Sequence, residues 1–336
     1  MPQPPLDVHK YFNKPLWRIG DKYPPGTGGT GARKEWPQGT LTGVEVIEDF
    51  DKLVLEYFDK FPKTPIYPSP YYKYPKFVQV EYELPEAFKT SQDLQKALAM
   101  LPLSCVASVI TALEDGPQGC TSNRRVDAAG YESDGGEEPE ESLPPKDVNK
   151  IWKWRFSKSP LGSGELLLVK GLSNDVNMVV RTINPAAFTA ADWEEFVVTG
   201  PYRYNTKSKA SWYWSRTWGA CKRLDTRWWV LTDWQRWVFG KFNDDESHGW
   251  VSPILDFNTQ GPTVLQALFY WTQSSIGAAN GFTRSAKDVS DLAELFPDTP
   301  ARRVSISGKT GYVPRDARQV KKANESDIEE SDAEDH

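Results

Sequence analysis

The chain has 336 residues, of which 39% are hydrophobic and 26% charged, and its formal net charge is −6. Fourteen tryptophans, 14 tyrosines and 15 phenylalanines bring the aromatic share to 13%, which excludes a wholly disordered chain because aromatic residues on this scale build a core. The composition also excludes collagen-like and coiled-coil architectures. The sequence has no run of about 18 apolar residues, so we predict no membrane span. The length leaves room for one large domain or two ordinary ones.

The negative charge is concentrated in two segments. Residues 114–147 hold ten acidic and three basic residues, and residues 324–336 hold seven acidic residues and no base. Without these segments the net charge changes from −6 to +8, so the part that we expect to fold is basic. We predict that residues 114–147 are disordered, and that residues 299–336 form a disordered tail, first basic and then acidic.

The N-terminus and the cysteines indicate an intracellular protein. The first residues, Met1 to Pro5, show no charged start followed by an apolar run, so no secretory signal is predicted. Cys105, Cys120 and Cys221 form no CxxC pair, which is typical of a reducing compartment. We therefore expect a cytoplasmic or nuclear location and no membrane partner.

The N-terminal half predicts four elements. Residues 1–45 are rich in Pro and Gly and lack periodicity, so we expect mostly irregular chain there. Apolar residues at helical spacing predict an amphipathic helix over 47–61. We then expect a strand over 77–84, a helix over 91–100 and a buried strand over 106–113, for which a short helix is the alternative.

The C-terminal half has sharper signals. Two apolar runs, 165–170 and 176–183, flank a Ser-Asn-Asp turn and predict a hairpin. Capping residues and apolar periodicity predict four helices. These are expected from Thr189 to Val197, over 208–224, from Pro262 to Ile276 and over 288–296. Strands are predicted over 228–231 and 237–242, and a polar loop over 243–249.

These elements predict one α/β domain, with α+β as the alternative, built on a mixed, Trp-rich central sheet flanked by helices. Ten of the 14 tryptophans lie between Trp193 and Trp271. Trp228 and Trp229 must point to opposite faces of a strand, and helices on both faces would bury both rings. The domain would comprise residues 46–113 and 148–298, with 114–147 as an insertion; an interdomain linker is the alternative.

Motifs for metal, cofactor or nucleophile chemistry are missing or out of context. HExxH and GxSxG do not occur, and the chain has three histidines. Gly26–Gly31 matches GxGxxG without a strand before it, and Ser307–Thr310 lacks the first glycine of a Walker A loop. His248 follows Asp244–Glu246 in a loop that we expect to be solvated, with a cation site as the alternative. We predict no cofactor, no metal site and no catalytic residue.

The strongest local signal is an aromatic and basic segment over 203–227. Seven bases face one acid, so its net charge is +6. Basic side chains neutralise phosphates and aromatic faces stack on bases, which predicts binding of nucleic acid or another polyanion. The alternative is an amphipathic helix with Trp214, Trp218 and Cys221 in the core. The candidate binding residues are Arg203, Lys207, Lys209, Arg216, Lys222, Arg223 and Arg227.

The C-terminal tail contains predicted phosphorylation sites. Ser305 follows Arg302 and Arg303, as in substrates of basophilic kinases, whereas Ser326 and Ser331 precede acids, as in substrates of acidophilic kinases. A phosphate at any of them would add negative charge.

Two resemblances concern residues 192–271. The runs Gly200-Pro-Tyr-Arg-Tyr, Lys207-Ser-Lys-Ala-Ser-Trp-Tyr-Trp and Trp229-Val-Leu-Thr-Asp-Trp resemble uncharacterised intracellular proteins of basidiomycete fungi, a family that implies no activity. A helix followed by Val230-Leu-Thr-Asp and Trp237-Val-Phe is similar to the later core of restriction-endonuclease-like (PD-(D/E)xK) folds. Those enzymes hold Mg²⁺ with an Asp and a Glu-x-Lys on adjacent strands.

Glu-x-Lys is missing from the two nearby strands, 165–170 and 176–183, so the second resemblance implies a degenerate, non-catalytic member. The leading hypothesis is a non-catalytic intracellular protein that binds a partner or polyanion through its basic aromatic helix. The alternatives are a degenerate or active metal-dependent nuclease-like enzyme and a purely structural scaffold.

Overall fold

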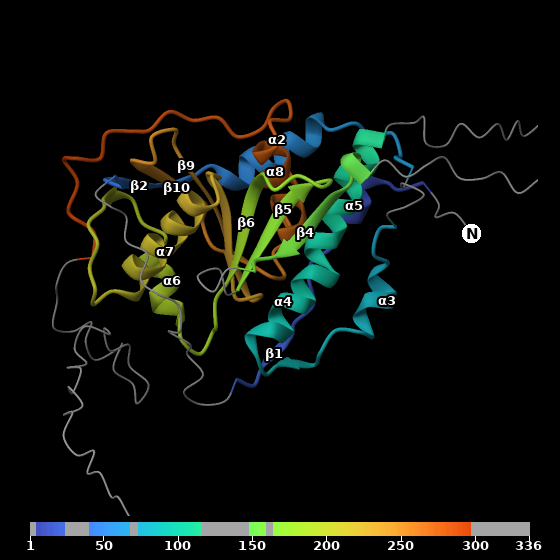
Figure 1. Ribbon diagram of the computed structural model, residues 1–336, viewed down its shortest axis with the longest axis horizontal. Coiled ribbons are helices and arrows are strands. Elements are labelled where there is room, and N and C mark those ends of the chain that lie inside the picture. Colours follow the sequence, from blue (N-terminus) through green and yellow to red (C-terminus); the bar gives the residue numbers. More distant parts are fainter. Residues whose placement is uncertain (1–4, 24–39, 68–72, 116–147, 159–163, 297–336) are drawn as a thin grey trace, which may run out of the picture.

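The computed structural model describes residues 5–23, 40–67, 73–115, 148–158 and 164–296. Within these ranges, nine strands form one mixed sheet in the middle of the molecule (Figure 1). They are β2 (Gly43–Val46), β4 (Trp152–Phe156), β5 (Glu165–Lys170), β6 (Val176–Thr182), β7 (Gly200–Pro201), β8 (Trp228–Thr232), β9 (Arg236–Phe242), β10 (His248–Val251) and β11 (Leu255–Asp256). The strand order is β4-β5-β6-β8-β9-β10-β2-β7, with β11 beside β9.

The sheet combines antiparallel neighbours with two parallel pairs. Strands β5 and β6 form the hairpin that the sequence predicts, with Glu165 opposite Arg181. Strand β8 lies parallel to β6 and antiparallel to β9, and β10 lies parallel to β2. The mixed α/β sheet expected from the sequence is therefore present.

Helices cover both faces of the sheet. One face carries α2 (Phe50–Lys60), α4 (Ser91–Met100), α5 (Pro102–Asp115) and α8 (Val264–Ser275), and the short helix α1 (Val8–Phe12) joins the same core. The other face carries α6 (Ala190–Phe196) and α7 (Lys209–Arg223), which form the connection between β6 and β8. Beside the first layer lie α3 (Phe77–Glu81) and the small parallel pair of β1 (Gly20–Asp21) and β3 (Ala87–Phe88).

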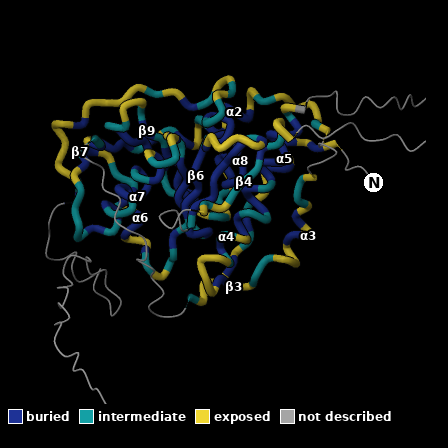
Figure 2. Tube along the Cα trace, viewed as in Figure 1, coloured by how far each residue is buried: buried dark blue, intermediate teal, exposed yellow. Residues whose placement is uncertain are grey.

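The two adjacent tryptophans of β8 point into opposite cores, as expected. Trp229 is fully buried against Trp214 of α7, with ring centroids 5.4 Å apart. Trp228 packs on Trp271 of α8 at 4.9 Å. The central strands are buried on both faces (Figure 2), so the tryptophan excess is explained by the two layers of core on either side of β8.

Three helices begin with reciprocal caps. Thr90, Thr189 and Thr263 each accept a hydrogen bond from the backbone of the third helical residue, whose side chain bonds back to the threonine amide. Such capping boxes satisfy two otherwise unpaired amides at a helix start. They explain why the predicted starts of α4, α6 and α8 agree with the structure to within two residues.

Two segments predicted as strands are helices. Residues 77–81 form α3 because Phe77 and Val80 face the core at helical spacing, while Val78 and Tyr82 are 68% and 86% exposed. Residues 106–113 lie in α5, the alternative considered for this run. A run that is apolar on every side carries no periodicity, so length and the flanking Pro102 were the better guides.

Two further predictions were wrong. Residues 288–296 form one turn and otherwise irregular chain instead of a helix. The loop expected over 243–249 ends early, because His248 is already in β10. The N-terminal segment, expected to be mostly irregular, also contains α1 and the core strand β2, whose pairing with β10 joins residues about 200 positions apart in sequence.

Some sequence predictions lie outside the described residues. They are the glycine-rich run 26–31, residues 116–147 of the acidic segment, the Walker-like run 307–310, the tail from 299, and the candidate phosphorylation sites Ser305, Ser326 and Ser331.

Helices α4 and α5 together form one stretch, Ser91–Glu114, that is long and apolar enough to cross a membrane by length and composition. Its most apolar window has a mean hydropathy of 1.8 and is 72% buried within the protein. Contact with β4, α8 and the rest of the core therefore accounts for its composition.

The closest packing in the sheet gives a test. A Cβ at Gly240 would lie 1.9 Å from the Trp229 ring, so Gly240→Ala forces the indole out of its core position. We expect the free energy of unfolding to fall by about 3 kcal/mol, the upper end for overpacking, measured by urea denaturation. Gly20→Ala, where the new Cβ would meet neighbours at an ordinary 3.4 Å, should change it by less than about 0.5 kcal/mol. Equal effects of the two substitutions would contradict this packing.

Candidate functional site

Helix α7 points tryptophans toward the core, and most of the basic residues on and beside the helix form ion pairs with carboxylates. Trp214, Trp218 and Cys221 are at most 2% exposed, as the core alternative predicted. Five of the seven candidate polyanion-binding residues lie within 4 Å of an acid that another element supplies. The pairs are Arg203–Glu294, Lys209–Asp192, Lys222–Glu246, Arg223–Glu165 and Arg227–Asp244.

The remaining two candidates are also placed by the fold. Arg216 is 5% exposed and its guanidinium lies 4.7 Å from the centre of the Trp212 ring. The backbone amide of Lys207 donates to the Asn205 side chain in the turn before α7. Most of the positive charge of this helix is thus balanced within the described chain, and the polyanion surface stays a prediction.

A buried ion triad joins α7 to the sheet. Glu165 of β5 accepts two hydrogen bonds from the Arg223 guanidinium, at 2.8 and 3.0 Å. Arg181 of β6 lies 3.5 Å from the same carboxylate and donates to the backbone oxygen of Arg216. Both Glu165 and Arg181 are almost fully buried. A single carboxylate therefore holds two guanidinium groups on the face of the sheet that α7 covers.

The described residues contain no group of three or more His, Cys, Asp or Glu side chains that could hold a metal ion. His248, which we expected in a solvated loop, is instead the first residue of β10. Its ring is buried, with Nε2 3.5 Å from Glu45 of the neighbouring strand, while Asp245 instead accepts hydrogen bonds from Ser247.

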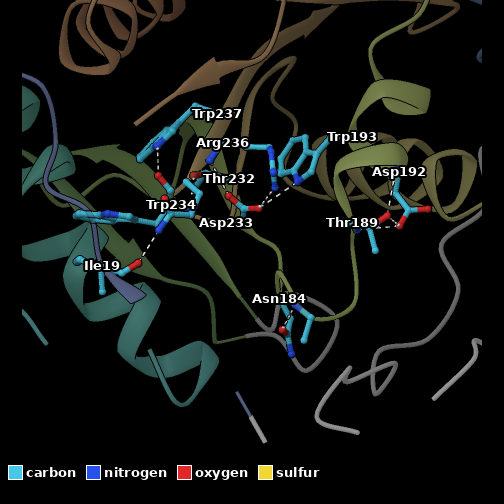
Figure 3. Close-up of polar contacts among 12 residues, drawn as sticks. Ile19, Asn184, Thr189, Asp192, Trp193, Thr232, Asp233, Trp234, Arg236 and Trp237 are labelled. Atoms are coloured by element: carbon cyan, nitrogen blue, oxygen red, sulfur yellow. Dashed lines mark hydrogen bonds and ion pairs between the residues drawn. The ribbon is translucent and has the colours of Figure 1, made fainter. Parts of the chain in front are cut away.

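A further buried carboxylate, Asp233, lies directly after β8. Its Oδ1 accepts a hydrogen bond from the Arg236 amide at 2.7 Å, and its Oδ2 accepts one from the Trp193 indole at 3.1 Å. The Arg236 guanidinium lies 3.5 Å from Oδ2. Figure 3 shows the contacts from Trp193 of α6 and from Arg236, the first residue of β9, converging on this carboxylate.

The pKa of Asp233 is raised to about 6, mainly by burial and to a smaller extent by the charge of nearby Asp21. The hydrogen bonds from Arg236 and Trp193 and the Arg236 charge act in the opposite direction. Burial also raises the pKa of Asp21, against the charge of Arg236. Carboxyl groups of this kind, buried and titrating near neutrality, concentrate at functional sites.

Asp233 faces a cleft of about 480 Å³. The lining comes from four segments that are distant in sequence: β1 and the residues before it, Pro185, the β8–β9 turn, and β11 with the residues after it. The lining residues are Arg18, Ile19, Gly20, Asp21, Pro185, Asp233, Gln235, Arg236, Asp256, Phe257 and Asn258. We call this the Asp233 cleft.

The β8–β9 turn that presents Asp233 is held tightly. Trp234 has φ of +78°, a conformation that few residues other than glycine adopt. Its amide donates to Thr232 and its buried indole donates to the backbone oxygen of Trp17. Next to it, the Gln235 amide group donates to the backbone of Ile19. The N-terminal segment is therefore fixed to the turn and forms one wall of the cleft.

Sequence reasoning did not identify this cleft. Asp233 follows an apolar strand directly, and a carboxylate at that place was a usable signal. Asp21 and Asp256 lie in segments without periodicity, and nothing in the sequence indicates that they approach Asp233.

Comparisons with family models, with curated proteins and with solved structures gave no match for this chain. The resemblances to the fungal proteins and to the restriction-endonuclease-like fold therefore stay predictions.

The ion triad predicts a large effect on stability. Glu165→Gln leaves two guanidinium groups without their counter-charge, one of them buried, and we expect the free energy of unfolding to fall by about 3 kcal/mol. The control is Glu56→Gln, which removes an exposed pair with Lys52 at 3.7 Å and should cost at most about 0.5 kcal/mol. Urea denaturation of both variants measures this. If Glu165→Gln left the free energy of unfolding unchanged, the triad would contribute little to stability.

The raised pKa of Asp233 predicts a pH dependence. Between its ordinary value near 3.8 and its value of about 6 in the folded chain, the folded state binds more protons than the unfolded state, so stability falls as pH rises. The free energy of unfolding of the native chain minus that of Asp233→Asn should therefore fall by about 2 kcal/mol from pH 4 to pH 7. A constant or rising difference would contradict the assignment, and Asp59→Asn, at an exposed position of α2, provides the control.

Proposed function

We propose that the protein binds a small, polar, positively charged molecule in the Asp233 cleft. The observation that carries this proposal is a fully buried carboxylate, with its pKa raised to about 6, at a cleft that two more carboxylates line. A carboxylate in this state has lost hydration and has regained only part of it from protein donors.

The place of the cleft in the sheet supports binding. Strands β6 and β8 are parallel, and Asp233 follows the carboxyl end of β8. In open α/β sheets, ligands bind in the crevice outside the carboxyl ends of the strands. The strained backbone at Trp234 is a second supporting feature, because such residues cluster at ligand sites when the surroundings enforce them.

The charges of the lining specify the class of ligand. Asp21, Asp233 and Asp256 outnumber the two guanidinium groups, of Arg18 and Arg236, and Arg236 is already engaged with Asp233. A bound amine or guanidine would supply the positive charge that Asp21 and Asp233 lack. Since a bound cation lowers the pKa of Asp233 from about 6, binding at pH 6 should release protons.

We also propose that the core is a non-catalytic relative of restriction-endonuclease-like folds. The succession of α5, the antiparallel strands β4, β5 and β6, helix α7 and the parallel strand β8 supports this proposal. On the adjacent strands β5 and β6, Glu165 faces Arg181 instead of a second acid and a lysine. A carboxylate already neutralised by two guanidinium groups is a poor ligand for Mg²⁺, so this relationship favours binding over cleavage.

The ligand class can be tested with a small panel. Agmatine, ethanolamine and choline should raise the midpoint of thermal unfolding at pH 7, whereas acetate and methyl phosphate should not, because only cations compensate the carboxylates of the cleft. At 100 times its dissociation constant, a ligand stabilises the fold by about 2.7 kcal/mol. Asp233→Asn and Asp21→Asn should abolish the shift, and the exposed Asp59→Asn should keep it. Stabilisation by the anions, or an unchanged response of Asp233→Asn, would overturn the proposal.

A further inference from the structure

The segment after α8 crosses the sheet without regular secondary structure. Residues 281–290, which we call the strap, lie over β2 and β10, and the chain continues to Leu295, whose amide donates to the backbone of Pro201 in β7. Figure 1 shows this part of the chain as an extended trace along the rim of the fold, from α8 toward the β2 and β7 edge. Its contacts are independent of the Asp233 cleft.

The strap is held by two buried apolar side chains. Phe282 packs on Trp250 and Trp271, with ring centroids 6.1 and 5.1 Å apart. Val289 covers Gly43 of β2 so closely that a Cβ on the glycine would lie 2.8 Å from it. The residues between them are exposed or half-buried. This alternation of anchors and exposed positions is typical of a bound linear peptide.

Two basic side chains of the strap meet acids of the domain. The Arg284 guanidinium donates to Asp49, just before α2, at 2.5 Å. Lys287 places its ammonium 2.9 Å from Oε1 of Glu45, which Arg284 also approaches at 3.8 Å. Glu45 is 1% exposed, so the strap covers a buried carboxylate. The sequence of anchors is therefore Phe-x-Arg-x-x-Lys-x-Val.

The strap makes few other bonds. Among the described residues, the backbone of Thr283 to Asp288 forms no hydrogen bond with another backbone group. Beyond its first two residues, whose amides donate to Ala278 and Ser274, the strap is attached through side chains, and such a segment opens at a low free energy compared with the core. The strap can therefore detach from β2 and β10 while α8 and the sheet stay folded.

The surface of β2 and β10 beneath the strap contains buried polar atoms whose hydrogen bonding is incomplete. Glu45 is reached by Lys287 at 2.9 Å and by His248 Nε2 at 3.5 Å, but neither of its oxygens accepts a hydrogen bond of good geometry, and Trp250 Nε1 has no hydrogen-bond partner among the described residues. All three side chains are more than nine-tenths buried. Buried polar atoms without partners cost free energy, so a segment that satisfies them would bind better than the strap does.

We propose that the groove formed by Gly43, Glu45, Asp49, His248 and Trp250 is a peptide-binding site that the strap occupies as a tethered ligand. The partner is a linear segment with an aromatic residue followed by basic residues two and five positions later. Glu45 and Asp49 select its charges, and Trp250 with Trp271 receives its aromatic ring. Because the strap is tethered, it competes at a high effective concentration and keeps the groove closed to weak ligands.

A peptide added in trans tests the proposal. The probe is a fluorescein-labelled peptide with the sequence of residues 281–290, added to the full chain carrying Arg284→Ala and Lys287→Ala. We expect fluorescence anisotropy to show binding at least tenfold tighter than to the native chain, whose own strap competes. Adding Glu45→Gln should weaken binding at least tenfold. The matched control, Lys52→Ala with Lys60→Ala on the exposed side of α2, should behave as the native chain.

Three outcomes would overturn the proposal. They are no binding by a strap variant whose circular dichroism is native, equal binding by the native chain, and equal binding of a peptide with Gln in place of Arg and Lys. A measurement on the native chain guards against misfolded variants. Excess unlabelled peptide should accelerate hydrogen exchange of the Phe282 amide, which donates to Ser274 Oγ when the strap is in place, and leave the α8 amides unchanged; a Phe282 amide that the peptide does not accelerate would also refute the proposal.

Discussion

The fold depends on burying large indole rings on both faces of one central strand. Trp229 fits over Gly240 of β9 on one face, and on the other face Trp271 donates its N–H to the backbone oxygen of the same glycine. An indole brings a large apolar area and one donor that usually finds a partner when buried. Trp271 satisfies its donor in this way, whereas Trp229 Nε1 has no hydrogen-bond partner among the described residues. The rings therefore fix both how far apart the layers lie and how the layers are oriented around β8 and β9.

Indole donors also connect parts of the chain that are distant in sequence. Trp234 bonds to Trp17, Trp193 to Asp233, and Trp218 to Glu246. The first of these bonds closes the N-terminal wall of the Asp233 cleft, and the second orients its carboxylate. The same rings that build the core thus hold the candidate site, because a buried donor is satisfied only by a partner at one definite position.

Three buried carboxylates have three different environments. Glu165 is held by two arginines and serves the packing of α7, Asp233 is held by neutral donors with one arginine and faces a cleft, and Glu45 lies under a segment attached through side chains. A buried charge needs compensation wherever it occurs. Where the compensation is complete, the residue stabilises the fold. Where it is partial, a ligand or a competing segment that completes it gains binding free energy.

The sequence by itself determined the α/β class, the β5–β6 hairpin, the capped helices and the inward face of α7, because periodicity, turn residues and caps act over a few positions. It did not determine α3, where the apolar residues alternate as in a strand, or α5, where they carry no usable period, nor the pairing of β2 with β10. It also missed the partners of Asp233 and the carboxylates that pair with Lys209 and Arg223. Without those carboxylates, α7 looked like a free basic surface. Only the tertiary structure decided these points, because burial and compensation of charge depend on residues up to about 200 positions apart that the fold alone brings together.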